Sequence, residues 1–292
     1  MYVISVISLA FALVVGVLVW VDPLGLVSYG RNMTIYPIWD DSIPQEENAT
    51  VTDPGSTLAK WDYTRSYDYP DDAKCTPEEF FEKWMAVEGV TLDDLEARGA
   101  KQLIIVAAKI YPDYETTLTC YQRQANGKWK AVDGLTALPG TMGRNGLNHD
   151  RVQGDETSPG GLWQLGTCFG NEPKPTGLKM PWRDITPESE WVGKNGRYYN
   201  TWQEIDKITD VQLNYGNGEH LVEYTSSYAL ACVVRFNMYP YTVRGKGSGI
   251  FFHVSTSGTA GCIGLPYDAF KKCILWLNPA DNPYMLITGF EG

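Results

Sequence analysis

A histidine and a cysteine lie nine residues apart in the stretch FFHVSTSGTAGCIGLP, residues 251–266. His253 ends an apolar run, and Cys262 follows Gly261 in a segment of small residues. A thiol becomes a strong nucleophile when a neighbouring base takes its proton, and imidazole is a common base. The Gly-rich segment can fold back and bring the two side chains together. The pair therefore predicts thiol acyl-transfer chemistry, and spacing alone leaves open a turn thiol beside a core histidine.

The backbone around Cys262 supports the chemical interpretation. The cysteine precedes a predicted helix over residues 267–277, and a cysteine near a helix N-terminus has a lowered pKa because the helix dipole favours the thiolate. Gly261 permits a tight turn and a close approach of a carbonyl substrate. Exposed N–H groups in such a turn can hold an oxyanion.

The other five cysteines carry no comparable signal; they lie at positions 75, 120, 168, 232 and 273. The chain has no CxxC pair and no histidine spaced for zinc, so we expect no metal and no cofactor. Cys120, Cys232 and Cys273 lie in apolar patterns and are expected in the core. Their disulfide pairing, if any, is left open.

Short strand-like runs separated by Gly, Pro and Asn follow residue 101. These runs read LIIVAAKI, TTLTCYQR, KWKAVDG, GLWQLG, EYTSSYALACVVRF, GSGIFFHV and YMLITGF. One late helix is predicted over YDAFKKCILWL, where Phe270, Cys273, Ile274 and Leu277 share one face. The pattern predicts a mostly β, largely antiparallel domain over residues 101–292, a β-sandwich or barrel-like fold with few helices.

Two helices are expected before this domain. Thr76, Pro77 and Glu79 form a capping-box start, and a second short helix begins at Thr91 and ends near Gly99. Residues 76–100 are therefore assigned as a helical lead-in.

The N-terminus predicts a membrane anchor. Residues 2–21 are uncharged and long enough to cross a bilayer, so we expect a single-pass signal anchor over residues 1–21. Residues 22–75, acidic and interrupted by prolines, are expected to form an extracytoplasmic stalk. The net charge of −11 arises before residue 101, because residues 101–292 hold eighteen acids and eighteen bases. No basic footprint for nucleic acid follows from this distribution.

The stretch GKGSGIFFHVSTSGTAGCIGLP resembles the L,D-transpeptidase (YkuD-type) catalytic domain, in a branch with a short T-A-G-C motif. The upstream segments QGDETSPGGLWQL, RYYNTW, GEHLVEY and VVRFN are similar to that branch as well. The resemblance covers about residues 100–289. It implies a YkuD-like fold, a cell-wall peptidoglycan transpeptidase facing the wall, and stem peptides as substrates.

The resemblance also implies roles for individual residues. Cys262 would be the nucleophile, His253 its base, and the N–H groups of Gly261 and Cys262 the oxyanion donors. Four further residues are candidates for substrate binding: Thr259, Ser255, Arg244 and His220. Local hydrogen bonding is the preferred alternative for His220, and His149 is expected to be exposed in a polar turn.

The chain departs from the better-known members of this family. Thr259-Ala260-Gly261-Cys262 stands where Ser-His-Gly-Cys is usual, so the second histidine is absent, and Gly264 replaces a polar residue two positions after the cysteine. Ser158 replaces the Thr that is usual in the upstream turn.

Two alternatives to the transpeptidase stay open. Water as acceptor would make the protein an L,D-carboxypeptidase, and loss of the second histidine adds weight to a non-catalytic wall-binding module. A sortase-like transpeptidase also places His before Cys, but it typically uses an Arg after the Cys, and the absence of any Arg after Arg244 argues strongly against it.

Overall fold

The computed structural model of the chain describes residues 27–29, 33–35, 74–108, 114–193, 196, 198–205 and 218–289. The predicted anchor and almost all of the predicted stalk lie outside the described residues. Within the described part of the chain, no helix has the length and apolar character needed to cross a bilayer.

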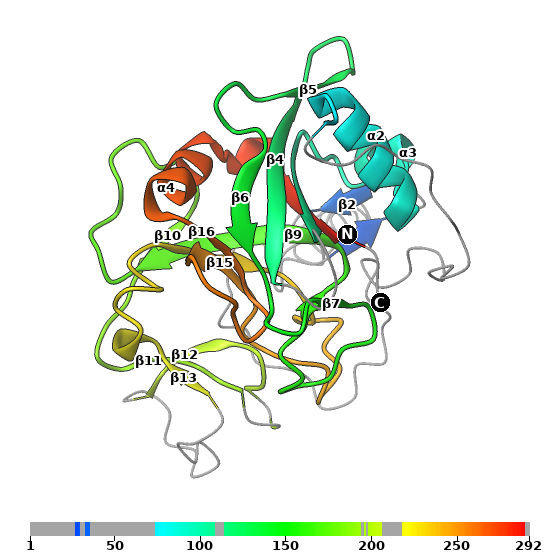
Figure 1. Ribbon diagram of the computed structural model, residues 1–292. Coiled ribbons are helices and arrows are strands. Elements are labelled where there is room, and N and C mark those ends of the chain that lie inside the picture. The colour runs from blue at the N-terminus through cyan, green and yellow to red at the C-terminus, as the bar shows by residue number, and fades with distance from the viewer. Residues whose placement is uncertain are drawn as a thin grey trace, which may run out of the picture.

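The described elements are mainly short strands (Figure 1). The strands are β1 (Val27–Tyr29), β2 (Met33–Ile35), β3 (Gln102–Ala108), β4 (Glu115–Arg123), β5 (Trp129–Ala131), β6 (Leu138–Thr141), β7 (Leu147–Asn148), β8 (Ser158–Pro159), β9 (Gly161–Gly170), β10 (Trp182–Asp184), β11 (Ser189–Trp191), β12 (Trp202–Glu204), β13 (Glu219–His220), β14 (Ala231–Val234), β15 (Phe251–Val254), β16 (Ile263–Leu265) and β17 (Pro283–Thr288). The helices are α2 (Pro77–Glu88), α3 (Leu92–Ala97), α4 (Tyr267–Trp276) and the 3₁₀ turns η3 (Leu221–Glu223) and η4 (Pro279–Asp281). This composition confirms the prediction of a mostly β protein.

The main sheet closes on itself. Its strands follow the order β9-β14-β15-β16-β6-β4-β3-β17, and β17 pairs with β9 again, while β10 and β5 add to β9 and β4. Most neighbours are antiparallel, but β9–β10, β15–β16 and β3–β17 are parallel. The barrel-like form expected from the sequence is therefore present.

Successive side chains along each strand point alternately into the barrel and out of it. The outward side chains form two separate clusters on the outside of the barrel. On β15, Phe252 belongs to the interior cluster, whereas Phe251 belongs to a second cluster outside the barrel. His253, two residues after Phe251, falls on the same outer face as Phe251.

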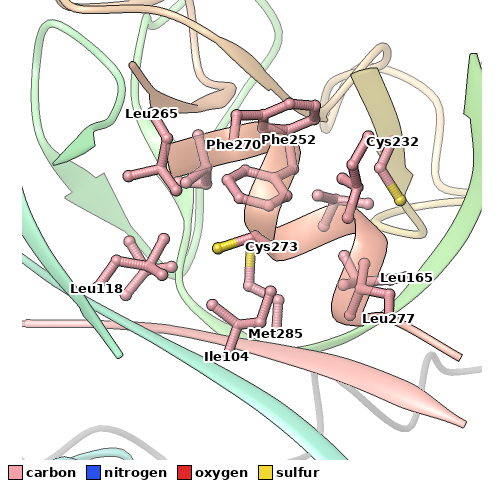
Figure 2. Close-up of a cluster of buried hydrophobic side chains, with 14 of the residues drawn as sticks. Ile104, Leu118, Leu165, Cys232, Phe252, Leu265, Phe270, Cys273, Leu277 and Met285 are labelled. Atoms are coloured by element: carbon pink, nitrogen blue, oxygen red, sulfur yellow. The ribbon is translucent and has the colours of Figure 1, made fainter. Parts of the chain in front are cut away.

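The apolar face of helix α4 packs on the interior cluster of the barrel (Figure 2). Phe270, Cys273 and Ile274 of the helix and Leu277 at its C-cap are fully buried, which confirms the helical face expected from their spacing. The sulfurs of Cys120 and Cys273 lie 3.8 Å apart in this cluster, and both cysteines are unpaired core thiols.

Helices α2 and α3 lie on one side of the barrel, and β11–β13 lie on the opposite side (Figure 1). The capping box expected at Thr76 is present, with Thr76 and Glu79 each accepting from the other's backbone N–H. Trp84 of α2 is buried against the outer faces of β3 and β17.

One predicted strand is much shorter than expected. In the run EYTSSYALACVVRF only Ala231–Val234 is a strand, because residues 224–230 turn back and the Tyr228 N–H bonds the Tyr224 carbonyl. This turn lets the Tyr228 ring pack on Phe169 and Phe251 instead of joining the sheet.

His149 joins the lead-in helix to the barrel, contrary to the expectation that it is exposed. Its Nε2 lies 2.7 Å from Oε1 of Glu88, a carboxylate whose side chain is only 3% exposed. Burial of Glu88 makes a polar partner necessary, and His149 supplies it.

Replacement of His149 by Ala is expected to lower the free energy of unfolding by about 1–3 kcal/mol, because it removes a partner of a buried polar group. Urea unfolding followed by circular dichroism measures the loss. Asp150→Ala is the matched control, since Asp150 is 92% exposed and a surface ion pair contributes at most about 1 kcal/mol. Equal effects of the two changes would contradict the docking role of His149.

Candidate functional site

Cys262 lies on the outer face of the barrel, immediately before β16. Its sulfur accepts a hydrogen bond from the Phe251 N–H and donates one to the Gly249 carbonyl, both at 3.3 Å. Cys262 packs in the same outer cluster as Phe251 and Tyr228. The parallel pairing of β15 with β16 thus brings the thiol loop and the histidine strand side by side.

His253 has the tautomer that a base requires. Its Nδ1 lies 2.9 Å from the carbonyl oxygen of Val254, and a carbonyl only accepts, so Nδ1 carries the proton and Nε2 the lone pair. Burial lowers the pKa of His253 and favours the neutral ring. The Tyr228 ring packs edge-on against the imidazole at a centroid distance of 5.5 Å.

The histidine and the thiol share a face without a direct hydrogen bond. Within the described part of the chain, the bonding partners of the Cys262 sulfur are backbone groups of Gly249 and Phe251. Catalytic hydrogen bonds often tighten only when substrate binds, and a proton transfer to His253 would need the thiol to leave the Gly249 carbonyl.

The pKa of Cys262 is raised, not lowered as its position before a helix predicted. Burial is the largest cause and the Glu219 carboxyl the next, and together they bring the pKa to about 12. The dipole of α4 does not lower the pKa of Cys262, because β16 separates Cys262 from this helix, whose N-cap is Pro266. The resting thiol is therefore neutral and needs a base during attack.

The T-A-G-C loop is held by its own threonine. Thr259 Oγ1 donates to the Cys262 carbonyl at 2.6 Å and accepts from the Gly261 N–H at 3.1 Å. The Gly261 N–H is therefore engaged within the loop rather than presented to an oxyanion. Gly261 has a φ of 139°, and a Cβ there would lie 2.9 Å from the Thr157 carbonyl oxygen.

The upstream segment of residues 151–158 forms a support beneath this loop. Ser158 Oγ donates to the Gly261 carbonyl at 2.7 Å and accepts from the Gly143 N–H at 2.9 Å. The hydroxyl of Ser158 can make both bonds, so its replacement of the usual threonine preserves the polar contact.

Glu219 is the member of the GEHL segment that approaches the thiol. It accepts a short hydrogen bond from Tyr228, and burial raises its pKa to about 7. His220 instead bonds the Pro187 carbonyl through Nε2 at 2.6 Å and lies 3.3 Å from the Glu223 carboxylate through Nδ1. These local partners match the alternative that the sequence favoured for His220.

The raised pKa of Glu219 predicts a pH-dependent stability. The folded state binds the proton more tightly than the unfolded state, whose pKa is near 4.5. The contribution of Glu219 is therefore fully present below pH 4.5 and is lost as the pH rises through about 7. Glu219→Gln keeps an acceptor for Tyr228 but removes the titration.

Urea unfolding at intervals from pH 4 to pH 9 tests this prediction. We expect the wild-type chain to lose stability relative to Glu219→Gln across the window between the two pKa values. Glu223→Gln, at a side chain 70% exposed, provides the control. A constant difference between wild type and Glu219→Gln would contradict the raised pKa.

Arg151 lies beside the thiol loop, buried to 3% exposure. The distance from its Nη2 to a Cβ built on Gly261 would be 3.3 Å. A sortase-like mechanism typically uses an arginine that follows the cysteine in sequence. An arginine more than a hundred residues before Cys262 occupies the neighbouring space instead, so sequence order does not exclude that chemistry.

The remaining predicted substrate contacts lie in local structure. Ser255 Oγ donates to the Ser257 carbonyl at 2.9 Å and accepts from its N–H, closing a turn. Arg244 is exposed in the turn before β15. The structure therefore brings Cys262, His253, Gly261 and Thr259 together, and gives Ser255, Arg244 and His220 other surroundings.

Sequence reasoning missed Arg151, Glu219 and Tyr228 as members of this site. The only sequence signal for Arg151 is its position just before the QGDETSPGG segment. Among the described residues, no group of three or more His, Cys, Asp or Glu side chains is placed to hold a metal ion.

Comparison with protein-family models, with curated proteins and with solved structures finds no match to this chain. The residues and their geometry therefore carry the functional argument.

Proposed function

We propose that the chain is a cell-wall cysteine L,D-transpeptidase with a YkuD-like fold, in which Cys262 is the nucleophile and His253 the base. The observation that carries this proposal is the placement of a neutral histidine and a thiol on one face of β15 and β16. Burial disfavours the thiolate of Cys262, so deprotonation must accompany attack, and His253 Nε2 has the lone pair for it.

The proposed reaction has two balanced steps. The Cys262 sulfur attacks the carbonyl at the L-centre of the diamino acid in a stem peptide, and His253 takes the thiol proton. The terminal D-amino acid leaves with that proton on its nitrogen, and a thioester remains. An amine of a second stem peptide then attacks the thioester, forms the cross-link and restores the thiol.

The loop offers one unengaged donor for the developing oxyanion. In the part of the chain that the structure describes, the Cys262 N–H has no hydrogen-bond partner, whereas the Gly261 N–H already bonds Thr259. A backbone N–H next to the nucleophile is a common oxyanion donor. We assign this role to Cys262 and a loop-shaping role to Thr259 and Gly261.

The apolar N-terminus extends the proposal to location. A single-pass anchor over residues 1–21 and an acidic stalk over residues 22–75 would hold residues 101–292 outside the cell membrane, facing peptidoglycan. No nucleic acid or cofactor takes part in the proposed reaction.

The test uses the full chain incubated with a disaccharide-tetrapeptide and read by intact-protein mass spectrometry. We expect an adduct equal to the donor minus its terminal D-amino acid, together with a cross-linked dimer. Cys262→Ala must lose the adduct, and Cys232→Ala, at a thiol in the barrel interior, must keep it. Adduct and tripeptide without dimer would instead support an L,D-carboxypeptidase.

A non-catalytic wall-binding module is the second candidate, favoured by the raised pKa of the thiol and the absent second histidine. It predicts that folded protein binds peptidoglycan without forming any adduct. Retention of wild-type binding by Cys262→Ala, with no adduct on either protein, would establish that candidate and overturn the enzyme.

A further inference from the structure

We propose that Arg151 is the internal counter-ion of the Cys262 thiolate, and so a positioning residue for the nucleophile. This inference rests on the proposed function in one respect, the use of the thiolate as a nucleophile. The ionisation itself can be measured without any peptidoglycan substrate, so the two ideas can fail separately.

The first observation is the space made for the guanidinium. A Cβ on Gly247 would lie 2.5 Å from Arg151 Nη1, and one on Gly261 would lie 3.3 Å from Nη2. Both glycines have positive φ, 116° and 139°. The guanidinium thus lies between two bare backbone segments, one of which leads directly into Cys262.

The second observation is that the buried cation lacks adequate partners. Nε and Nη1 of Arg151 are covered and make no hydrogen bond to the described residues. The contact of Nη2 with Asp155 Oδ1 is long, at 3.5 Å. That same oxygen already accepts from the N–H and the hydroxyl of Thr157 at 2.9 and 2.8 Å. A buried cation with one long ion pair and two unsatisfied nitrogens is costly, so a further anion beside it would stabilise it.

Burial of the guanidinium favours an internal anion over a carboxylate of the substrate. The covered Nε and Nη1 atoms are not open to an external ligand. Cys262 interacts electrostatically with Arg151, and the interaction lowers the pKa of the thiol. Removal of the thiol proton would therefore add a second anion, inside the site and within the electrostatic reach of the guanidinium.

The other ionisable groups near the thiol provide no positive charge at neutral pH. From β13, Glu219 raises the pKa of Cys262; Tyr228 bonds Glu219; and His253 on β15 has a lowered pKa. Asp155 and Tyr199 interact with Arg151 from its own side. Arg151 is thus the cation placed to stabilise a thiolate in the T-A-G-C loop.

The test measures the rate at which iodoacetamide alkylates Cys262 at fixed pH values between 7 and 9, in full-length chain, with the product mapped by peptide mass spectrometry. Because the pKa of the thiol is about 12, the rate in this range is proportional to the thiolate fraction. A Cys75→Ser background removes the half-buried Cys75, and the remaining cysteines are fully buried. Arg151→Met is expected to lower the rate roughly 10- to 1000-fold, because loss of an adjacent opposite charge raises the pKa of the thiol. Arg151→Lys should restore much of the difference.

Lys246→Met is the matched control, because Lys246 is a partly exposed cation that pairs with the exposed Asp150. It should leave the alkylation rate unchanged. An unchanged rate in folded Arg151→Met, or an equal fall in Lys246→Met, would overturn the proposal. A lower rate in Arg151→Met with no peptidoglycan adduct on wild type would retain the counter-ion and reject the transpeptidase.

A second pair of variants covers the case in which Arg151→Met does not fold. Cys262→Asp places an ionisable carboxyl at the position of the thiolate, and Cys262→Asn places a neutral group of the same shape there. With Arg151 as counter-ion, Cys262→Asp should unfold at a urea concentration at least as high as Cys262→Asn at pH 6, where Glu219 is mostly protonated. A clearly lower midpoint for Cys262→Asp would overturn the proposal.

Discussion

Replacement of His253 by Gln is expected to reduce the rate of thioester formation by about 10²–10⁴-fold, the usual contribution of a positioned general base. The resting thiol is neutral, since burial and Glu219 raise its pKa to about 12. His253 offers the lone pair of Nε2, because Nδ1 is committed to the Val254 carbonyl at 2.9 Å. Rapid-quench mass spectrometry with the disaccharide-tetrapeptide measures the rate directly.

Two comparisons make this result specific. His220→Gln removes a histidine whose partners are Pro187 and Glu223, and it should react at the wild-type rate. Alkylation of His253→Gln by iodoacetamide at a fixed pH between 7 and 9 should also match wild type, because hydroxide rather than His253 then removes the thiol proton. A wild-type rate of thioester formation in His253→Gln would transfer the role of base to another group, and Glu219 would be examined first.

Replacement of Gly261 by Ala should disturb both stability and acylation. Its φ of 139° is unfavourable for any L side chain, and the new Cβ would lie 2.9 Å from the Thr157 carbonyl oxygen and 3.1 Å from Ile250 Cδ1. Strained backbone positions cost about 1–3 kcal/mol. A displacement of the nucleophile by about 1 Å can reduce the rate about 100-fold, so we expect a loss of that order in thioester formation.

Gly245→Ala separates local packing from backbone strain. Gly245 also has a positive φ, 84°, but a Cβ there would meet nothing within 4 Å. The Gly245→Ala chain should be less stable than wild type but should keep the wild-type rate of acylation. Unfolding by urea and the acylation rate, measured on both variants, decide the matter. A Gly261→Ala chain with the acylation rate of Gly245→Ala would show that the loop tolerates displacement.

Strong periodicity made parts of the fold predictable. The capping box at Thr76 and the i, i+3, i+4, i+7 spacing from Phe270 to Leu277 encode local hydrogen bonds and one buried face, and both helices are present. The strands β10–β13 are two or three residues long. Such short segments show no measurable alternation, so the sequence did not indicate them.

The site was predictable only where its residues are neighbours in sequence. His253, Thr259, Gly261 and Cys262 occur within ten residues, and their spacing pointed to one loop and one strand. Arg151 and Glu219 arrive from distant segments through sheet closure, and nothing local marks them as partners of a thiol. The pKa of Cys262 depends on that assembled surrounding, which is why the helix-dipole argument predicted the wrong direction.

The closure of the barrel also constrains the order in which the chain can fold. β17 (Pro283–Thr288) pairs with β3 on one side and with β9 on the other. A ribosome-bound chain that has not yet released residues 283–288 has two unsatisfied strand edges, and the interior around α4 is open. Emerging domains with such edges are prone to aggregate. The barrel can therefore close only after synthesis has passed β17, even though Arg151, His253 and Cys262 are all made earlier.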